Sequence, residues 1–405
     1  MTFKPHSPSW RRCNGTVLAS EPLIELAAAE QTCNRPYVLL DDQKSNVGIL
    51  LTDAAEILRA QHADEVPEVL DRADALADSG ATLAGFLSFR SGAAFDRLEM
   101  QKATLGTCPT PCLWLAAFNR KITGVVDRHP PPPLTPKLVP RICRAEYEVM
   151  IDQALGHIRS GDIYQVNLTF PIMAELSDSL AYYRSRRAAA HGPYGGIVET
   201  GLETILSFSP ELFFDYDDGR LTARPMKGTR PRAADRGADQ AAAGDLRESR
   251  KDKAENLMIV DLLRSDMARI CEAGSITVPE LFAIESYPTV WQMTSTVTGT
   301  PRADVKLSSI LRALFPCGSI TGAPKIMASK IIASIERWDR GAYTGSIGWF
   351  GKQSAQMNVA IRTAQRARGA AFARIDVGAG IVADSVPAAE WAECLAKSRF
   401  AGSVI

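Results

Sequence analysis

Val377-Gly-Ala-Gly-Ile-Val-Ala383 and Ala388-Ala-Glu-Trp-Ala-Glu-Cys-Leu-Ala-Lys397 place a glycine-rich apolar strand or turn just before a charged helix. The serine and the proline between the two stretches are helix start signals. At 100° per residue, Glu390, Glu393 and Lys397 lie within about a 60° sector of this helix. We therefore expect two acids and one base to share a face.

This charged face has a structural and a functional interpretation. Charges at i,i+3 and i,i+4 spacing are common on exposed helices. A binding role is favoured by the preceding glycines, because a bare backbone lets N–H groups approach an anion. A nucleotide site is not implied: no βαβ unit follows Gly378-Ala-Gly380, and the lysine of Gly318-Ser-Ile-Thr-Gly-Ala-Pro-Lys325 follows proline instead of glycine.

Composition indicates a globular protein with a small-molecule partner. The chain has 405 residues, 46% of them hydrophobic, with 46 basic and 46 acidic side chains. A net charge of zero gives no overall attraction to nucleic acid or to an anionic membrane. No apolar stretch approaches the 18 or so residues of a membrane span. We expect a cytoplasmic protein whose eight cysteines are reduced thiols.

The clearest boundary is the proline-rich stretch between His129 and Pro140, which is predicted to be a stiff extended connector. On this basis residues 1–127 are an N-terminal accessory portion, 128–140 a connector and 141–405 the portion that carries the chemistry.

The sequence patterns predict several individual elements. A helix is expected around residues 53–61 and another over 144–160, ending at Gly161. Residues 165–170 alternate like a strand. Residues 232–253 have no periodicity and suggest a mobile surface loop running into a helix, and residues 254–271 are apolar enough to suggest a buried helix.

Lys227 is the most unusual base in the sequence. It stands in Arg224-Pro-Met-Lys-Gly-Thr-Arg230, between an apolar residue and a Gly-Thr turn. Such a lysine can be desolvated, which lowers its pKa and makes the amine nucleophilic. The alternative is an ordinary exposed lysine in a turn. Taken together, the candidate residues could bind a hard divalent cation through their acids and a carboxylate ligand through their bases. The acids are Glu211, Glu255, Glu390 and Glu393, and the bases are Lys227, Arg362 and Lys397.

Motifs from about Tyr147 to the end of the sequence resemble those of the chorismate-utilising enzymes. They are Gly161-Asp-Ile-Tyr-Gln, Ser209-Pro-Glu, Pro225-Met-Lys-Gly-Thr, Lys253-Ala-Glu-Asn-Leu-Met-Ile-Val-Asp-Leu, Gly318-Ser-Ile-Thr-Gly-Ala-Pro-Lys, Tyr343-Thr-Gly-Ser-Ile-Gly, Ile361-Arg-Thr and Gly378-Ala-Gly-Ile-Val-Ala-Asp-Ser. The resemblance implies an α/β (α+β) sandwich of the anthranilate synthase large-subunit type, with two sheets wrapped by helices around a deep cleft.

Two positions suggest the subclass within this family, and a third departs from the family pattern. Lys227 resembles the aminodeoxychorismate synthases, whereas anthranilate synthases usually carry Ala there. Gln165 stands where isochorismate and salicylate synthases place a lysine that activates water. Gln292 stands where many members have histidine, and an amide can hydrogen-bond a substrate hydroxyl but cannot exchange a proton at neutral pH.

The resemblance implies amination of chorismate by ammonia to 4-amino-4-deoxychorismate, on the route to p-aminobenzoate and folate. Ammonia would come from a separate glutamine amidotransferase subunit, since the chain has no Cys-His-Glu glutaminase pattern. Two alternatives stay open: anthranilate synthase component I, and a catalytically silent paralogue that binds a related ligand.

The resemblance also assigns roles to residues. Lys227 would attack C2 of chorismate and Glu211 would be the general acid. Substrate would be bound by Arg362, Tyr343, Gly378, Gly380, Gly228, Thr229, Lys397, Gln165 and Gln292. Mg2+ would be held by Glu255 and Glu393, with Asp252 and Glu390 binding its waters, an all-oxygen shell that suits a hard ion.

Overall fold

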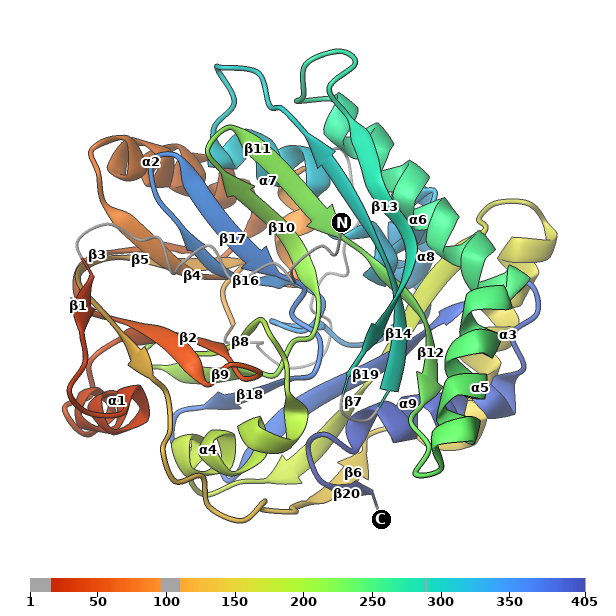
Figure 1. Cartoon of the computed structure of the whole chain (residues 1–405), viewed down its shortest axis with the longest axis horizontal. Helices are drawn as coiled ribbons and strands as arrows, with labels where there is room; N and C mark the ends of the chain where they lie inside the picture. The colour runs from red at the N-terminus through yellow and green to blue at the C-terminus, as the bar shows by residue number, and fades with distance from the viewer. Residues whose placement is uncertain (1–15, 96–109, 288–289, 405) are drawn as a thin grey trace.

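The computed structural model describes residues 16–95, 110–287 and 290–404. Backbone hydrogen bonds join its strands into one open path that folds into two facing layers (Figure 1). In order of pairing, the first layer contains β20 (Ser403–Val404), β6 (Lys137–Pro140), β7 (Gln165–Glu175), β19 (Phe372–Ile381), β18 (Thr363–Ala367), β9 (Glu203–Ser207), β8 (Gly195–Glu199) and β2 (Tyr37–Asp42), with β15 (Gly322–Ala323) also on β7.

The long strand β3 (Val47–Ala60) pairs with β2 and with β5 (Leu113–Val125), and so carries the path into the second layer. From β5 this layer continues through β4 (Thr82–Leu87), β16 (Ser346–Phe350), β17 (Ser354–Asn358), β10 (Leu212–Asp217), β11 (Arg220–Arg224) and β14 (Val290–Gly299). The remaining strands are β1 (Val17–Leu18) on β5, and β12 (Met226–Pro231) and β13 (Thr277–Ser286) on β14.

Helices cover both outer faces. Over the first layer lie α1 (Leu23–Thr32), α3 (Arg144–Arg159), α4 (Ser179–Ala190), α8 (Lys325–Ile335) and α9 (Pro387–Ser398). Over the second lie α2 (Val66–Asp78), α6 (Arg250–Ala268) and α7 (Leu307–Leu314), while α5 (Arg236–Glu248) lies beside β12. The 3-10 turns are η2 (Ala63–Glu65), η3 (Phe89–Ala94) and η4 (Gly318–Ile320).

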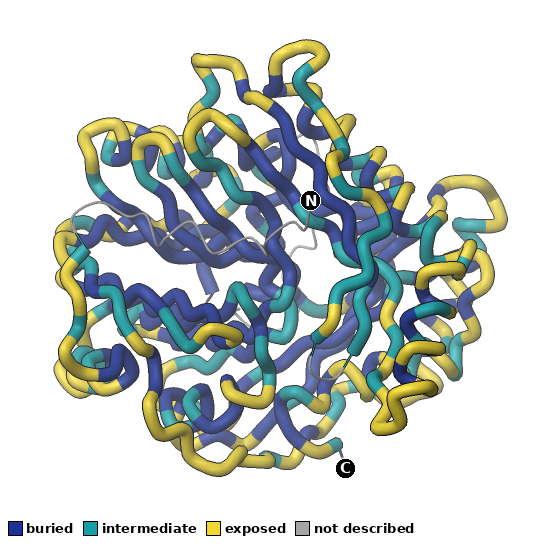
Figure 2. Tube along the Cα trace, viewed as in Figure 1, coloured by how far each residue is buried: buried dark blue, intermediate teal, exposed yellow. Residues whose placement is uncertain are grey.

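Alternating strand residues explain why the layers stack. In β4, Ala84 and Phe86 face a core between the layers, whereas Leu83 and Leu87 face the core beneath α2. Because both faces are covered, the strands are buried along most of their length (Figure 2). The predicted α/β sandwich is confirmed, with the difference that its two layers are continuous through β3 and β5.

Three local predictions were confirmed and three were wrong. The helix ending before Gly161, the strand from Gln165 and the C-terminal helix all form. Residues 53–61 are not a helix, because pairing with β5 draws them into β3. Residues 232–253 run into α6 as predicted, but α5 takes the place of most of the predicted loop, and α6 buries only one face.

The N-terminal portion contributes strands to both layers. β2 pairs with β8, and β4 pairs with β16, so the sheets cross the proposed boundary between residues 1–127 and 141–405. Among the described residues, no helix is long and apolar enough to cross a membrane.

Candidate active site

Lys227 lies on β12, and its side chain is half-buried. Its ammonium nitrogen makes a long 3.5 Å contact with the carbonyl oxygen of Ser319. A Cβ placed on Gly380 of β19 would lie 3.4 Å from that nitrogen, so the lysine reaches across to the other layer. Burial, with a contribution from the charge of Lys397, lowers the pKa of Lys227, although Glu255 acts in the opposite direction.

Glu211 lies directly before β10 and is buried. Its Oε1 accepts a hydrogen bond of 3.1 Å from the Ser319 hydroxyl. Burial raises the pKa of Glu211 to about 7, although Lys227 and the Ser319 hydrogen bond act in the opposite direction. Glu211 and Lys227 therefore both have pKa values displaced toward neutrality, which is the arrangement needed for an acid and a nucleophile at pH 7.

Ser319 is the site residue that sequence reasoning missed. It lies on η4, where its hydroxyl contacts Glu211 and its carbonyl contacts Lys227. The available signal was its place in the motif from Gly318 to Lys325, to which no role had been given. Lys325 of that motif is structural, because its amine donates to Asp266 (2.7 Å) and to a carbonyl of α7 (2.9 Å).

Two polar groups at the site have no hydrogen-bond partner among the described residues. The Gln165 side chain is fully buried, and both its amide oxygen and its nitrogen are unpaired. The half-buried Arg362 guanidinium, whose pKa is lowered by burial, lines a hollow of about 390 Å³ together with Tyr287 and Gln292. An unpaired buried amide is costly, and the positive charge of Arg362 faces the hollow, so the site favours a polar, anionic ligand.

Gln292 holds the turn that follows Lys227. Its Oε1 accepts from the Thr229 hydroxyl at 2.8 Å, and its Nε2 donates to the Gly228 carbonyl at 3.0 Å. Gly228 has a φ of +85°, and a Cβ there would lie 2.9 Å from Asp252. This turn therefore requires glycine, and Gln292 fixes the orientation of the threonine.

The charged face of α9 points toward Lys227, because the charges of Glu393 and Lys397 both act on its pKa. Lys397 donates to Glu393 at 2.7 Å and to the carbonyl of Gly378 at 3.0 Å. Burial acts to lower the pKa of Lys397, but the carboxylate of Glu393 holds that pKa above its usual value. About half of each side chain is exposed (47% and 53%), so the face borders an opening.

The four acids predicted to bind metal lie on α6 and α9, and three of them have basic partners, of which Glu255 has the longest contact, 4.0 Å from the Lys251 amine. Asp252 accepts from Arg230 at 2.9 Å, and Glu393 pairs with Lys397. Across residues 16–95, 110–287 and 290–404, no three His, Cys, Asp or Glu side chains form a group that could hold a metal. Burial raises the pKa of Glu255 and of Glu390, and the charge of Glu393 adds to both shifts.

Tyr343 is buried, and its pKa is raised by burial and by the neighbouring Cys394 of α9. Gly378 is packed so closely on β7 that a Cβ would lie 2.7 Å from the Leu168 carbonyl. The structure thus brings Lys227, Gln165, Gly380 and Lys397 to one place between β12, β7 and α9.

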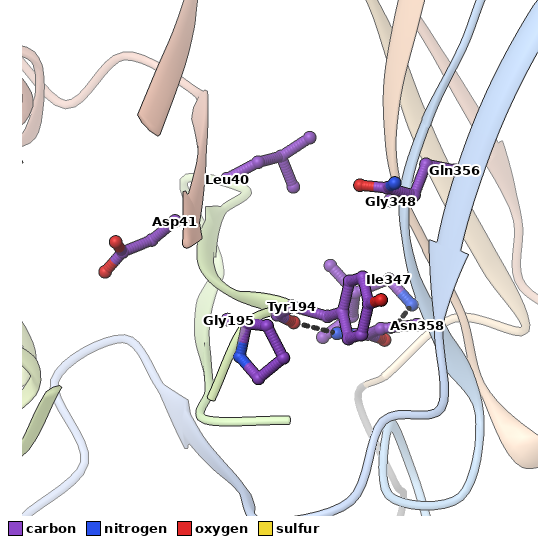
Figure 3. A pocket seen from close by; sticks show the side chains of 9 residues that line it. Leu40, Asp41, Tyr194, Gly195, Ile347, Gly348, Gln356 and Asn358 are labelled. Carbon is purple, nitrogen blue, oxygen red and sulfur yellow. Dashed lines mark hydrogen bonds between the residues drawn. The ribbon is translucent and has the colours of Figure 1, made fainter. Parts of the chain in front are cut away.

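A second hollow, of about 270 Å³, lies between β2, β8, β16 and β17 (Figure 3). Asn358 closes one side, since it donates to the Tyr194 carbonyl at 2.8 Å and accepts from the Ile347 N–H at 2.9 Å. None of the predicted site residues lines this hollow.

Residues 34–402 match the family described as chorismate binding enzyme, and the chain belongs to that family. It is 41% identical to aminodeoxychorismate synthase component 1 of Klebsiella aerogenes over 256 residues, which are 63% of this chain and 56% of that protein. It is 39% identical to anthranilate synthase component 1 of Saccharolobus solfataricus over 249 residues, 61% of this chain and 59% of that protein. The chain spans about half the length of the curated relatives that it matches.

Solved structures support the fold. Anthranilate synthase component I from Streptococcus pneumoniae aligns with a TM-score of 0.76 at 23% identity, covering 87% of this chain and 91% of that one. The menaquinone-specific isochorismate synthase of Escherichia coli aligns with a TM-score of 0.74 at 18% identity, covering 94% and 90%.

Proposed function

We propose that this protein aminates chorismate with ammonia, giving 4-amino-4-deoxychorismate for p-aminobenzoate and folate synthesis. Support comes from membership of the chorismate binding family and from the relatives named aminodeoxychorismate synthase. The observation that carries the proposal is Lys227 next to Glu211, with both pKa values displaced toward neutrality.

The pair suits covalent catalysis. The neutral amine of Lys227 attacks C2, the ring double bond shifts, and the C4 hydroxyl leaves as water with a proton from Glu211. Ammonia then adds at C4, the double bond shifts back, and the C2–N bond breaks to release the lysine. One difficult displacement thus becomes two easier steps.

The proton states that this scheme needs agree with the environment of each group. A pKa of about 7 keeps a substantial fraction of Glu211 protonated at neutral pH, so it can donate to the leaving hydroxyl. Desolvation of Lys227 raises the fraction of its amine that is neutral and nucleophilic.

Substrate carboxylates would be bound by the groups that lack partners or present N–H bonds. We assign the enolpyruvyl carboxylate to Arg362, Tyr343 and the Gly378 backbone. Arg362 suits this role because its guanidinium has no hydrogen-bond partner among the described residues and can bind a carboxylate bidentately. We assign the ring carboxylate to Gly228, Thr229, Gly380 and Lys397. Gln165 offers its unpaired amide to the ring, and Gln292 holds Thr229.

The acids of α6 and α9 supply carboxylate oxygens, which are the ligands that a hard divalent cation prefers. Burial raises the pKa of Glu255 and of Glu390, and the carboxylate of Glu393 adds to both shifts, so extra positive charge between these groups would be stabilising. We propose that Glu255 and Glu393 hold Mg2+, with Asp252 and Glu390 binding its waters. When bound, the ion neutralises the ring carboxylate of chorismate. Lys397, which pairs with Glu393 in this structure, would supply a positive charge for the ring carboxylate.

Ammonia is proposed to come from a glutamine amidotransferase subunit, since the relatives are named component 1. A net charge of zero gives no reason to expect nucleic acid or membrane as a further partner. The cytoplasmic location remains a prediction.

A product assay tests the proposal. Purified protein is incubated with chorismate, Mg2+ and an ammonium salt, and the products are identified after adding a lyase that converts 4-amino-4-deoxychorismate to p-aminobenzoate. We expect p-aminobenzoate. Anthranilate would favour the second candidate, which is supported by the 39% identity to an anthranilate synthase component 1. Chorismate binding without any product would indicate the silent paralogue.

A further inference from the structure

Arg340 and Glu336 form a buried ion pair that no proposed step uses. Arg340 donates from Nε to Glu336 Oε2 at 2.9 Å and from Nη2 to Oε1 at 2.7 Å. Both side chains are 1% exposed, and the guanidinium lies over the Phe89 ring at 4.3 Å. Such a pair is costly to desolvate, and further hydrogen bonds to its remaining N–H groups and oxygens offset that cost.

The remaining N–H groups of Arg340 reach segments that carry site residues. Nη1 donates at 3.2 Å to the carbonyl of Ile320, which directly follows Ser319 on η4. Nη2 also donates at 2.7 Å to the carbonyl of Asn167, two residues after Gln165 on β7. One guanidinium therefore joins the turn that carries Ser319 to the strand that carries Gln165.

The pair is also tied to the segment of Tyr343 and to β7. The Tyr343 N–H donates to the Arg340 carbonyl at 3.1 Å, and Nη1 donates to the Thr344 hydroxyl at 3.3 Å. Glu336 Oε1 accepts from both the N–H (2.8 Å) and the hydroxyl (3.0 Å) of Thr169. Arg340 is thus the common partner of three segments at the site.

We propose that Arg340, held by Glu336, is a positioning residue that keeps the Ser319 hydroxyl on Glu211. The proposal rests on the proposed function for its kinetic consequence only. Arginine is needed because several N–H donors in one plane make these contacts together, which the single ammonium of lysine cannot reproduce.

The consequence for Glu211 follows from its surroundings. The groups that act on this carboxyl are the Lys227 ammonium, the Ser319 hydroxyl and the Met226 N–H, and the Cys317 thiol lies 3.2 Å from the Ser319 oxygen. The Ser319 bond stabilises the carboxylate and so lowers the pKa of Glu211. Moving Ser319 away should therefore raise that pKa.

The test compares Arg340→Lys with Arg187→Lys. Arg187 forms a similarly buried bidentate pair with Asp41, in which Nε and Nη2 each donate to a carboxylate oxygen at 2.7 Å. This pair contacts neither Ser319 nor Tyr343. The Glu211 titration is followed by 13C NMR of glutamate-labelled protein, with the resonance assigned from Glu211→Gln. We expect the midpoint to rise by roughly one pH unit in Arg340→Lys, since a hydrogen bond to a charged group is lost, and to stay unchanged in Arg187→Lys.

A second background separates positioning from general damage. In Ser319→Ala, the further change Arg340→Lys should no longer move the Glu211 midpoint, because the contact it acts through is absent. In the aminating protein, Arg340→Lys should also lower kcat by on the order of tenfold and move the alkaline limb of its pH profile upward.

An unchanged or lowered Glu211 midpoint in Arg340→Lys, an equal shift in Arg187→Lys, or a full shift in the Ser319→Ala background would overturn the proposal. If Arg340→Lys does not fold, Glu336→Gln, which keeps the shape of the pair, is titrated in its place with the same expected rise. If the wild type does not aminate chorismate, the proposed function fails, while the titration still decides the role of Arg340.

Discussion

Lys227 places its ammonium nitrogen 3.4 Å from the point where a Cβ would stand on Gly380. The same point is 3.3 Å from Nε2 of Gln165. Because Gly380 has no side chain, the space between Lys227 on β12 and the unpaired amide of Gln165 on β7 stays open. We propose that the chorismate ring binds there.

Gly380→Ala should lower kcat/KM by at least about tenfold, because a methyl group would occupy this space and displace Lys227. Gly156→Ala is the matched control, since a Cβ at that helical glycine meets nothing within 4 Å. The two variants are compared by steady-state kinetics and by thermal unfolding. Wild-type kinetics in Gly380→Ala would remove this space from the site.

The pKa of about 7 at Glu211 predicts both activity and stability as functions of pH. As general acid, Glu211 must be protonated, so kcat/KM should fall as pH rises above about 7. Its folded pKa is raised above the unfolded value, so its contribution to stability is complete below the unfolded pKa and is lost as pH rises through 7.

Glu211→Gln has no carboxyl group to ionise, so it should not lose stability as pH rises through 7. It should unfold less readily than the wild type at pH 8, by up to about 3 kcal/mol, while being inactive. Denaturant unfolding of both proteins at pH 5 and pH 8 measures the difference. Equal pH dependence in the two proteins would show that Glu211 is not the group responsible.

Gln292→His should add a pH dependence that the wild type does not have. A neutral imidazole can accept the Thr229 hydrogen bond that Gln292 accepts at 2.8 Å, but an imidazolium cannot. Activity of this variant should therefore fall below about pH 6.5. Gln292→Met removes both hydrogen bonds and adds no titrating group, so its activity should be lower than that of the wild type at every pH. A profile for Gln292→His that matches the wild type would argue against this role.

Glu393→Gln should abolish Mg2+-dependent turnover while leaving the melting temperature nearly unchanged, because the side chain is half exposed and pairs only at the surface. Glu148→Gln is the control, since Glu148 forms a similar i,i+4 pair with Arg144 at 2.7 Å on another helix. Activity that survives in Glu393→Gln, or in EDTA, would contradict the Mg2+ assignment.

The sequence was sufficient where local pattern and tertiary structure agree. The helix that begins at Arg144 and the C-terminal helix follow from their spacing and end signals. Residues 53–61 have helix-forming composition, but β5 supplies partners for most of residues 54–60, and strand pairing overrides the local preference. The local sequence of residues 53–61 does not indicate that they pair with β5.

The site shows the same limit. Lys227 and Glu211 could be singled out from their motifs, whereas Ser319 meets Glu211 across 108 positions of the chain and Arg340 meets Asn167 across 173. Gln292 is predicted to contact substrate, and the structure adds that both ends of its amide bind Gly228 and Thr229. Such pairings depend on how β12, β14 and η4 meet, which spacing along one segment cannot specify.

The most direct test of the central claim is product analysis of Lys227→Ala with chorismate, Mg2+ and ammonium salt, followed by the lyase step. We expect p-aminobenzoate to be lost and any remaining flux to appear as anthranilate, because ammonia could then reach C2 itself. A folded Lys227→Ala that still yields p-aminobenzoate at nearly the wild-type rate would contradict the covalent role of Lys227.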